Sequence, residues 1–276
     1  MNKYEVGKIF EPGHFYSPIP DLKEIKVRKS SIFRKRADEE VLGINLNKEK
    51  QMNHLEIIRA YINSFNFPLD SVEDGKFYFK NKIFSGLDAL AYFSFILQYT
   101  PSKIIEIGAG FSSLLAMEVN HRFFNNNIQI QLIEPYPSQN LIKGIENFKN
   151  AKLILKPVQD LDLSIFQTLQ KNDILFIDST HVAKIGSDVN YIFFEILPKI
   201  NTEVLIHFHD IFIPDEYPPK WVFEENRAWN EMYILKAFLM FNNNFQTVFS
   251  SYYVFTRFLD KVLDIFGKPI GGGLTG

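Results

Sequence analysis

The stretch from Ile104 to Ser113, with the sequence IIEIGAGFSS, constrains the fold of this chain more than any other segment. An apolar run with one glutamate leads into two glycines, and two serines precede the apolar run Leu114–Met117. This order predicts a buried strand, a tight turn and the start of a helix. Glycine lets a backbone approach a ligand closely, and the first N–H groups of a helix point toward that ligand. We therefore expect a ligand-binding turn at Gly108–Gly110.

The turn alone does not identify its ligand. Many folds that bind small molecules use a glycine-rich connection between a strand and a helix. Ser113 stands where the dinucleotide fingerprint G-x-G-x-x-G would carry its last glycine. The sequence downstream of the turn must therefore decide what the turn binds.

From residue 103 onward the sequence alternates between strand and helix patterns. Strands are predicted over 104–107, 128–133, 153–155, 174–177 and 203–207. Helices are predicted over 113–122, 141–147, 163–169, 185–200 and 230–241, and two earlier helices over 51–65 and 86–98. Such alternation predicts an α/β fold with a mostly parallel sheet that has helices on both faces. Residues 245–256 are predicted to form a strand pair around Ser250 and Ser251.

Composition narrows the class of protein. Among 276 residues there is no cysteine, which excludes disulfides and thiolate metal sites and suits a reducing compartment. The net charge of -2 gives no reason to expect nucleic acid as a partner. The chain starts with a polar segment and has no apolar run of membrane-spanning length. We expect a soluble, cytoplasmic protein that does not bind membranes, and its oligomeric state stays open, with a homo-oligomer as one option.

The chain divides by composition into two regions. Residues 1–75 are predicted to form an N-terminal extension of loop and helices that acts as a lid or cap. Within it, the charged stretch 23–40 is interpreted as a solvated face. Residues 76–276 are predicted to form the ligand-binding domain, with the sheet at its centre.

Ligands on parallel sheets bind at the carboxyl ends of the strands, so the residues there are the candidates. Glu134 ends the second strand, where an acid commonly accepts hydrogen bonds from a ribose; a surface glutamate is the alternative. Glu106 lies inside the first strand, where a buried carboxylate needs a partner. Gln159 and Asp160 follow the third strand, where they could contact a base or form a plain turn.

Two clusters of acids and histidines follow the next two strands. Asp178 and His181 come after the fourth strand, and His207, His209 and Asp210 end the fifth. Because these strands should be neighbours, we expect the clusters to meet at one edge of the sheet. Carboxylates and imidazoles suit a divalent cation, and a histidine beside it could accept a proton from a hydroxyl.

With these motifs assembled, residues 78–260 resemble the class I S-adenosylmethionine-dependent methyltransferases. The likeness is closest to the branch of metal-dependent O-methyltransferases that act on sugars and related natural products. It implies a Rossmann-like sheet of seven strands with the last one antiparallel, and a cofactor-binding domain over 76–276. The cofactor-binding residues that it implies are Glu106, Gly108, Gly110, Ser112, Glu134, Gln159, Asp160 and Asp178.

The same resemblance implies the roles of the acid–histidine clusters. Asp178 is similar to an acid that binds Mg²⁺ in that branch, and His181 to its general base. Asp210 and His209 fall where the branch carries a Glu-Asp pair of metal ligands, so His209 departs from the pattern with a softer donor. The predicted cation is Mg²⁺ or Mn²⁺, bound by Asp178, His209 and Asp210.

We therefore expect an S-adenosylmethionine-dependent O-methyltransferase that acts on a small hydroxylated acceptor with the aid of a divalent cation. Three alternatives stay open from the sequence. The first is a methyltransferase that needs no metal, and the second is a nucleotide-binding module without transfer activity. The third is an iron oxygenase with His181, His209 and Asp178 as ligands.

The long segment 211–229, rich in proline and aromatic residues, is predicted to form a lid or a substrate wall.

Overall fold

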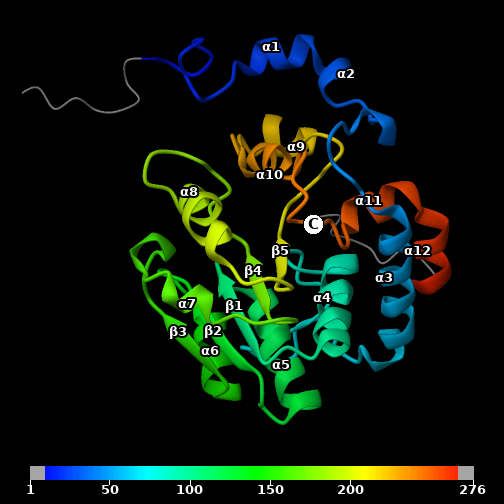
Figure 1. Cartoon of the computed structure of the whole chain (residues 1–276), viewed down its shortest axis with the longest axis vertical. Helices are drawn as coiled ribbons and strands as arrows, with labels where there is room; N and C mark the ends of the chain where they lie inside the picture. Colours follow the sequence, from blue (N-terminus) through cyan, green and yellow to red (C-terminus); the bar gives the residue numbers. More distant parts are fainter. Residues whose placement is uncertain (1–9, 267–276) are drawn as a thin grey trace, which may run out of the picture.

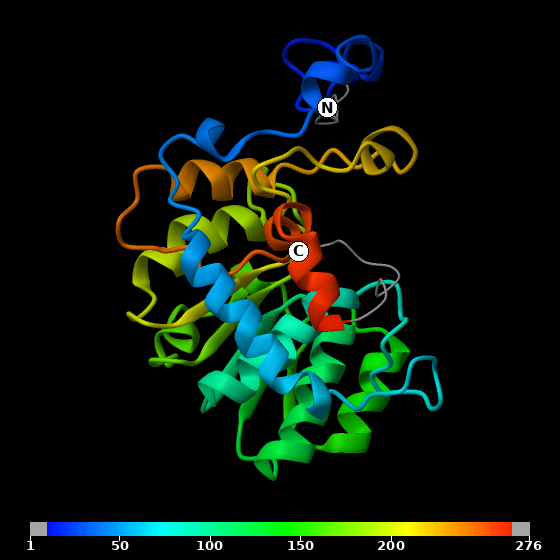
Figure 2. The same cartoon turned by 90° about the vertical axis from the view of Figure 1, so that its right-hand side faces the viewer.

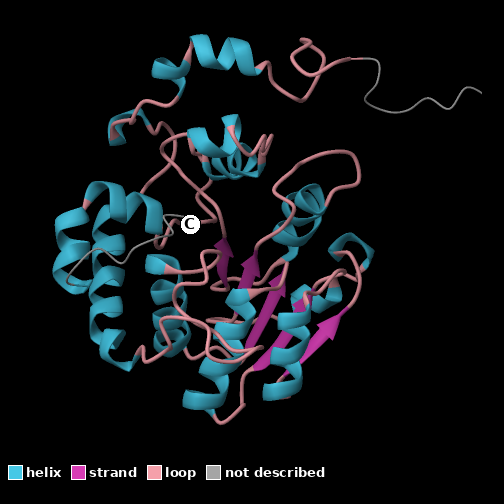
Figure 3. Ribbon diagram, turned by 180° about the vertical axis from the view of Figure 1, so that it is seen from behind, coloured by secondary structure: helices cyan, strands magenta, loops and turns pink. Residues whose placement is uncertain are grey.

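The computed structural model describes residues 10–266, and a five-stranded parallel sheet lies at its centre (Figure 1). Its strands follow the order β3-β2-β1-β4-β5, and they all point the same way (Figure 3). The strands are β1 (Lys103–Ile107), β2 (Gln129–Ile133), β3 (Ala151–Ile154), β4 (Ile174–Ile177) and β5 (Leu205–Phe208). The strand order reverses between β1 and β4, so their carboxyl ends form the crevice where ligands bind in such sheets.

Helices bury both faces of the sheet, and alternate residues of each strand face opposite sides. Ile104 of β1 belongs to one apolar core, whereas Ile105 and Ile107 belong to the other. The first face is covered by α4 (Gly86–Tyr99), α5 (Phe111–Phe124) and α6 (Gln139–Phe148). The second face is covered by α7 (Ser164–Gln167), α8 (Asp188–Tyr191) and α10 (Glu231–Leu239). The central strands are therefore apolar on both sides, as their sequences require.

A further layer of helices packs against α4 and joins the two halves of the sequence (Figure 2). It consists of α3 (Lys48–Tyr61), α11 (Ser251–Arg257) and α12 (Leu259–Phe266). Leu55 and Ile58 of α3 share a core with Leu90 of α4 and Val254 of α11. Residues from both ends of the sequence thus support the helix that covers β1 and β4.

The predicted α/β fold is confirmed, and all five strands predicted before residue 210 are present within one or two residues of their expected bounds. The helices predicted over 86–98, 113–122, 141–147 and 230–241 are also present. These elements carry strong hydrophobic periodicity, which is the most reliable signal in a single sequence.

The prediction of seven strands with the last one antiparallel was wrong. Residues 10–266 form five strands, all of them parallel, and none lies beyond β5. The segment after α10 instead makes hydrogen bonds to residues near the N-terminus. Asn47 Nδ2 donates to the carbonyl oxygen of Thr247 at 2.9 Å, and Ser250 N donates to Gln51 Oε1 at 2.9 Å. These contacts take the place of pairing with β5.

The strand pair predicted over 245–256 was wrong for a local reason as well. Ser250 Oγ accepts a hydrogen bond from Tyr253 N, so Ser250 is the N-cap of α11. A serine cap satisfies one of the free N–H groups at a helix start. The β-branched and aromatic residues of 251–257 favour a strand by propensity, but the cap and packing of Tyr253 and Val254 in the α3–α4 core favour the helix.

The helix predicted over 185–200 is shorter and irregular. It begins after Ser187, whose hydroxyl accepts a hydrogen bond from Asn190 N at 3.2 Å. Pro198 lacks an N–H and cannot continue regular α-helical bonding. After α8, the chain forms the π-helical turn η4 (Ile192–Ile196) and the 3₁₀ turn η5 (Leu197–Lys199).

The first described residues, 10–33, form an arm that lies away from the sheet (Figures 1 and 2). Its helices are α1 (Leu22–Val27) and α2 (Lys29–Ile32), neither of which has a buried residue. The chain after the arm is bound firmly to the main body. Arg36 N donates to Asp215 Oδ1 at 2.8 Å, and the hydroxyl of Tyr253 donates to Asp38 Oδ2 at 2.6 Å. The arm is thus joined to the loop that follows β5.

Four short elements complete the description. They are the 3₁₀ turns η1 (Asp38–Glu40), η2 (Ile62–Ser64) and η3 (Val158–Asp160), and the helix α9 (Pro219–Phe223). Among residues 10–266, no helix has the length and apolar character needed to cross a membrane.

The contribution of Asp173 to the contact between β1 and β4 can be tested by substitution. Its side chain is buried, and Oδ1 accepts hydrogen bonds from Ser102 N, Ser102 Oγ and Lys103 N at 2.8–2.9 Å. Oδ2 accepts one from Gln170 N at 2.8 Å. We predict that Asp173→Asn lowers the free energy of unfolding by about 2–3 kcal/mol, because charged acceptors are lost between β1 and β4. Urea unfolding followed by circular dichroism measures this.

Asp264→Asn is the matched control. Asp264 pairs with Arg59 at 2.8 Å, but its side chain is 69% exposed. A surface pair of this kind contributes at most about 1 kcal/mol. Equal effects of the two substitutions would contradict the role of Asp173.

Candidate functional site

The glycine turn after β1 lies directly against the chain that leaves β4. Gly108 has a φ of +78°, and a Cβ added there would lie 1.8 Å from the carbonyl oxygen of Asp178. Gly108 N donates to the carbonyl oxygen of Ile133 at 3.0 Å, and Asp178 N donates to that of Ile107 at 2.8 Å. Only glycine fits this position, because any side chain would collide with backbone atoms.

Gly110 has a different environment. Its φ of -166° is ordinary extended backbone, and a Cβ added there would meet nothing within 4 Å. It is the N-cap residue of α5, and the first N–H groups of a helix have no partners within the helix. The turn therefore combines one glycine packed against Asp178 with one that leaves room for a ligand at a helix N-terminus.

Glu106 is buried beneath this turn. Its carboxylate accepts a hydrogen bond from the hydroxyl of Ser112 on Oε1, and Oε2 makes no hydrogen bond. Burial raises the pKa of Glu106 to about 8, against the opposing effect of the Ser112 and Ser113 hydroxyls. A buried carboxyl with a free oxygen would gain from a ligand that donates a hydrogen bond or carries positive charge.

Glu134 joins the end of β2 to the glycine turn. Its Oε2 accepts a hydrogen bond from Ala109 N at 3.2 Å, and its Oε1 accepts one from Tyr136 N at 2.8 Å. The side chain is half-buried, and each carboxylate oxygen has a second lone pair for another donor. Sequence reasoning expected this acid near the turn, and the structure places it there.

Gln159 and Asp160 lie on η3, after β3, and both are exposed. Gln159 Nε2 makes one long contact, 3.5 Å, with the carbonyl oxygen of Gly186. Their assignment to the cofactor stays a prediction.

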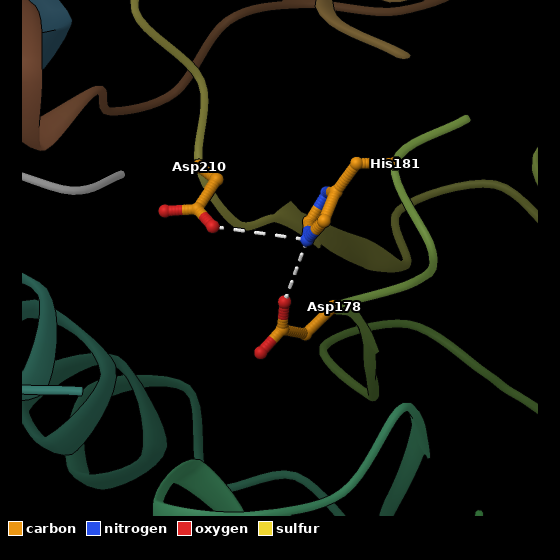
Figure 4. A group of neighbouring side chains, drawn as sticks. All are labelled: Asp178, His181 and Asp210. Atoms are coloured by element: carbon orange, nitrogen blue, oxygen red, sulfur yellow. Dashed lines mark ion pairs between the residues drawn. The ribbon is translucent and has the colours of Figure 1, made fainter. Parts of the chain in front are cut away.

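The acid–histidine clusters that follow β4 and β5 do meet. Figure 4 shows the carboxylates of Asp178 and Asp210 directed at the same nitrogen of the His181 imidazole. His181 Nε2 lies 3.2 Å from Asp178 Oδ1 and 3.7 Å from Asp210 Oδ2. His181 and Asp210 have φ values of +60° and +59°. Such left-handed backbone is uncommon outside glycine and tends to occur at functional sites.

The donor set of this cluster fits a divalent cation. One ligand atom each from Asp178, His181 and Asp210 lies within 4.8 Å of the others. Two carboxylates and one imidazole suit Mn²⁺ and similar ions, and the carboxylates alone also suit Mg²⁺. An iron site of two histidines and one carboxylate would need a different set, since this group has one histidine and two acids.

The charges of the cluster are strongly coupled. Burial disfavours the charged form of His181, but hydrogen bonds to Asp178 and Glu231 outweigh it and raise the pKa of His181 to about 9. Burial likewise opposes ionisation of Asp178, yet the charge of His209 and the hydrogen bond with His181 hold its pKa below the usual range. Imidazolium and carboxylate groups thus neutralise each other within the site.

His209 lies beside this cluster on the continuation of β5. Its Nδ1 is 3.6 Å from Asp178 Oδ1 and 3.5 Å from Asp210 Oδ1, and neither ring nitrogen makes a hydrogen bond. The burial of the ring lowers its pKa, but the charge of Asp178 outweighs this effect and raises the pKa above the usual value. His209 is not part of the three-residue ligand group, so its role as a metal ligand stays a prediction.

His207 has a different environment, two residues before His209. Its ring stacks on Phe176, with centroids 4.1 Å apart and an interplanar angle of 9°. Burial lowers the pKa of His207 to about 3, so the ring is neutral. The ring packs against the core under the sheet edge.

Sequence reasoning missed Glu231, Ser179 and the position of Trp229. Glu231 Oε2 lies 2.8 Å from His181 Nδ1, and Ser179 Oγ donates to Glu231 Oε1 at 2.9 Å. Trp229 stacks on the His181 ring with centroids 4.1 Å apart. An acid in the first turn of the helix predicted over 230–241 was the available signal for Glu231, but acids are common there for helix stability alone.

The loop over 211–229 forms an aromatic wall beside His181. The guanidinium of Arg227 lies over the rings of both Trp221 and Trp229, 4.0 and 4.4 Å from their centroids. Trp229 in turn stacks on the ring of His181, so the loop contacts the acid–histidine cluster through this tryptophan. The cation–π contacts stabilise the loop internally, and the stacking of Trp229 on His181 joins the loop to the site.

Comparison with known proteins agrees with this geometry. Residues 105–211 match a family described as a methyltransferase domain. This range runs from β1 past β5 and contains the glycine turn, Asp178, His181 and Asp210. An uncharacterized protein of Archaeoglobus fulgidus is 58% identical over 170 residues, which are 61% of this chain and 77% of that protein.

Two solved structures are similar to a lesser degree. One is the Podospora anserina methyltransferase PaMTH1 bound to S-adenosylhomocysteine, with a TM-score of 0.34, 19% identity, and coverage of 69% of this chain and 71% of that chain. The other, from Plasmodium falciparum, is described as a protein-L-isoaspartate O-methyltransferase in complex with S-adenosylhomocysteine. It has a TM-score of 0.32, 11% identity, and coverage of 67% of this chain and 79% of that chain.

The parallel sheet, the glycine turn and the domain match together support a class I S-adenosylmethionine-dependent methyltransferase. The chain belongs to the same family as the Archaeoglobus fulgidus protein, with a methyltransferase domain at 105–211.

The glycine turn gives a direct test. We predict that Gly108→Ala lowers the free energy of unfolding by more than about 2 kcal/mol, because the left-handed backbone is strained for alanine and its Cβ meets the Asp178 carbonyl. Gly110→Ala is the matched control, with ordinary φ and open space, and should cost less than about 1 kcal/mol. Urea unfolding of both variants measures the difference; a larger loss at Gly110 would contradict the packing described here.

Proposed function

We propose that this protein transfers a methyl group from S-adenosylmethionine to a hydroxyl of a small acceptor, such as a sugar or a natural product, with the aid of a divalent cation. The observation that carries the proposal is the convergence of Asp178, His181 and Asp210 beside the glycine turn. A methyl donor site and a hydroxyl-binding site would then share the Asp178 segment. The lack of cysteine suits a cytoplasmic location.

The residues around the turn would hold the cofactor. Glu106, with its unpaired Oε2, and the first N–H groups of α5 would face the methionine part, and Glu134 the ribose. S-adenosylmethionine supplies an electrophilic methyl group when it is bound. Methyl transfer needs the two reactants in line, so the contribution of these residues is chiefly positioning.

Asp178 and Asp210 would hold the cation, with His209 as a further ligand. Positive charge supplied there lowers the pKa of a bound acceptor hydroxyl and also disfavours the protonated form of His181. The two carboxylates come from adjacent strands, so their separation is fixed by the β4–β5 pairing. Such fixed donors position an acceptor without reorganisation of the site.

His181 would accept the proton from the acceptor hydroxyl. Its Nε2 faces the space between the two carboxylates, and Glu231 contacts the opposite ring nitrogen. Trp229 covers one face of the ring, which limits its rotation. A general base has to lie within hydrogen-bond reach of its proton donor, and Nε2 is the atom available for that contact.

Aromatic side chains of the loop over 211–229 would form one wall of the acceptor site. Trp229 adjoins His181, and Trp221 and Tyr217 pack edge-on against Trp229. Flat aromatic surfaces bind the apolar faces of sugar and ring-containing acceptors. This wall supports a ring-shaped acceptor.

The general-base role is open to a direct test. We predict that His181→Ala lowers methyl transfer by about 10²–10⁴-fold, the usual contribution of a positioned base, and leaves cofactor affinity within about twofold. The assay follows radiolabelled methyl groups from S-adenosylmethionine onto a panel of hydroxylated sugars and phenols, and calorimetry measures cofactor binding. His121→Ala, an exposed histidine on α5, is the control. Turnover that survives in His181→Ala would remove the base from the mechanism.

The cation requires a separate test that does not need the acceptor. We predict that the protein, stripped with EDTA, binds Mn²⁺ in calorimetry, and that Asp178→Asn or Asp210→Asn weakens this binding at least tenfold through loss of a charged ligand. Asp260→Asn, on the exposed side of α12, serves as the control. Absence of Mn²⁺ binding together with full activity after EDTA would favour the metal-independent methyltransferase instead.

A further inference from the structure

Glu231 is buried at the start of α10 and directed at the candidate site from behind His181. Its side chain is 1% exposed, and both carboxylate oxygens have partners: Ser179 Oγ at 2.9 Å on Oε1 and His181 Nδ1 at 2.8 Å on Oε2. A buried carboxylate is costly unless it is hydrogen-bonded in this way. No prediction from the sequence gave Glu231 a role.

Backbone hydrogen bonds join the segments that carry Glu231 and His181. The N–H groups of Asn230 and Glu231 both donate to the carbonyl oxygen of His181, at 3.0 and 3.1 Å. Asn230 also bonds to both backbone groups of Ala183, accepting from its N–H at 2.6 Å and donating to its carbonyl at 3.3 Å. These hydrogen bonds join the start of α10 to the segment after β4, so the side chains of Glu231 and His181 lie next to each other.

A neutral imidazole carries one N–H, and acceptors on both sides of His181 compete for it. Glu231 Oε2 lies 2.8 Å from Nδ1, whereas Asp178 Oδ1 and Asp210 Oδ2 lie 3.2 and 3.7 Å from Nε2. The Asp178 side chain is also 32% exposed, so water shares its hydrogen-bonding capacity. The shorter and more buried contact favours the proton on Nδ1.

We propose that Glu231 is a positioning residue that keeps the proton of neutral His181 on Nδ1 and leaves the Nε2 lone pair facing Asp178 and Asp210. The proposal rests on the function proposed above for His181. Its consequence is that a base or a metal ligand at Nε2 depends on an acid on the opposite side of the ring, 50 residues away in the sequence. Without Glu231, the carboxylates of Asp178 and Asp210 would draw the N–H to Nε2 and remove the lone pair.

The test reads the tautomer directly and needs neither acceptor nor cofactor. The full chain is labelled with ¹⁵N-histidine, treated with EDTA, and recorded by ¹H–¹⁵N correlation spectroscopy of the imidazole rings at increasing pH, until the His181 signals stop changing because the ring is neutral. The sequence has six histidines, and His181→Gln assigns the relevant ring by the loss of its signals. We expect a protonated Nδ1 and an unprotonated Nε2 in the wild type. We expect a shift of the proton to Nε2 in Glu231→Met and in the smaller Glu231→Ala.

Glu216→Met is the matched control, because Glu216 lies on the loop before α10 and accepts a hydrogen bond from Tyr233 rather than contacting His181. It should leave the His181 tautomer unchanged. A wild-type spectrum with the proton on Nε2 overturns the proposal without any variant, and so does an unchanged tautomer in a folded Glu231 variant. A failure of methyl transfer in the wild type would count against the proposed function alone, since the spectrum does not depend on it.

Discussion

The close approach of Gly108 to the backbone of Asp178 is the contact on which the arrangement of the site depends. The Asp178 carbonyl oxygen occupies the space in which any other residue at 108 would place its Cβ. This contact is possible because β1 and β4 are paired in register, Ile107 beside Ile177, with the strand order reversing between them. The turn at the N-terminus of α5 and the backbone of Asp178, the first acid of the cluster, therefore lie in van der Waals contact. A ligand in the turn and a group held by Asp178 would be neighbours for purely geometric reasons.

The parts of this arrangement that follow from local patterns could be predicted from the sequence. The strands around Ile104–Ile107 and Ile174–Ile177 are apolar on both faces, and the helices between them have clear periodicity. Parallel strands bring their carboxyl ends to one edge, so the meeting of Asp178, His181 and Asp210 followed from strand order alone. The turn at Gly108 could also be predicted, because this glycine stands at the junction of the predicted strand and helix.

The parts that depend on distant partners could not be predicted. Residues 251–257 have the composition of a strand, but Ser250 is bonded to Gln51 and caps a helix that packs on α3 and α4. Tertiary contacts override propensity in such short segments. Glu231 lies at the start of a predicted helix, and nothing near it in the sequence shows that it faces His181. That contact arises from main-chain hydrogen bonds between the segment after β4 and the start of α10.

Charge balance explains why the cluster can be buried at all. Asp178, Asp210 and Glu231 bring three carboxylates into one small volume, and His181 and His209 are the cationic groups that face them. Buried carboxylates this close together would be very costly without cationic partners, so His181 acts as the counter-ion of three acids and His209 as that of two. A divalent cation between Asp178 and Asp210 would neutralise these two carboxylates at the Nε2 side of the His181 ring. Glu231 would remain the partner of His181 at the Nδ1 side. The two sides of His181 thus have separate functions: the Glu231 side fixes the ring, and the Asp178–Asp210 side is where charge can be exchanged with a ligand.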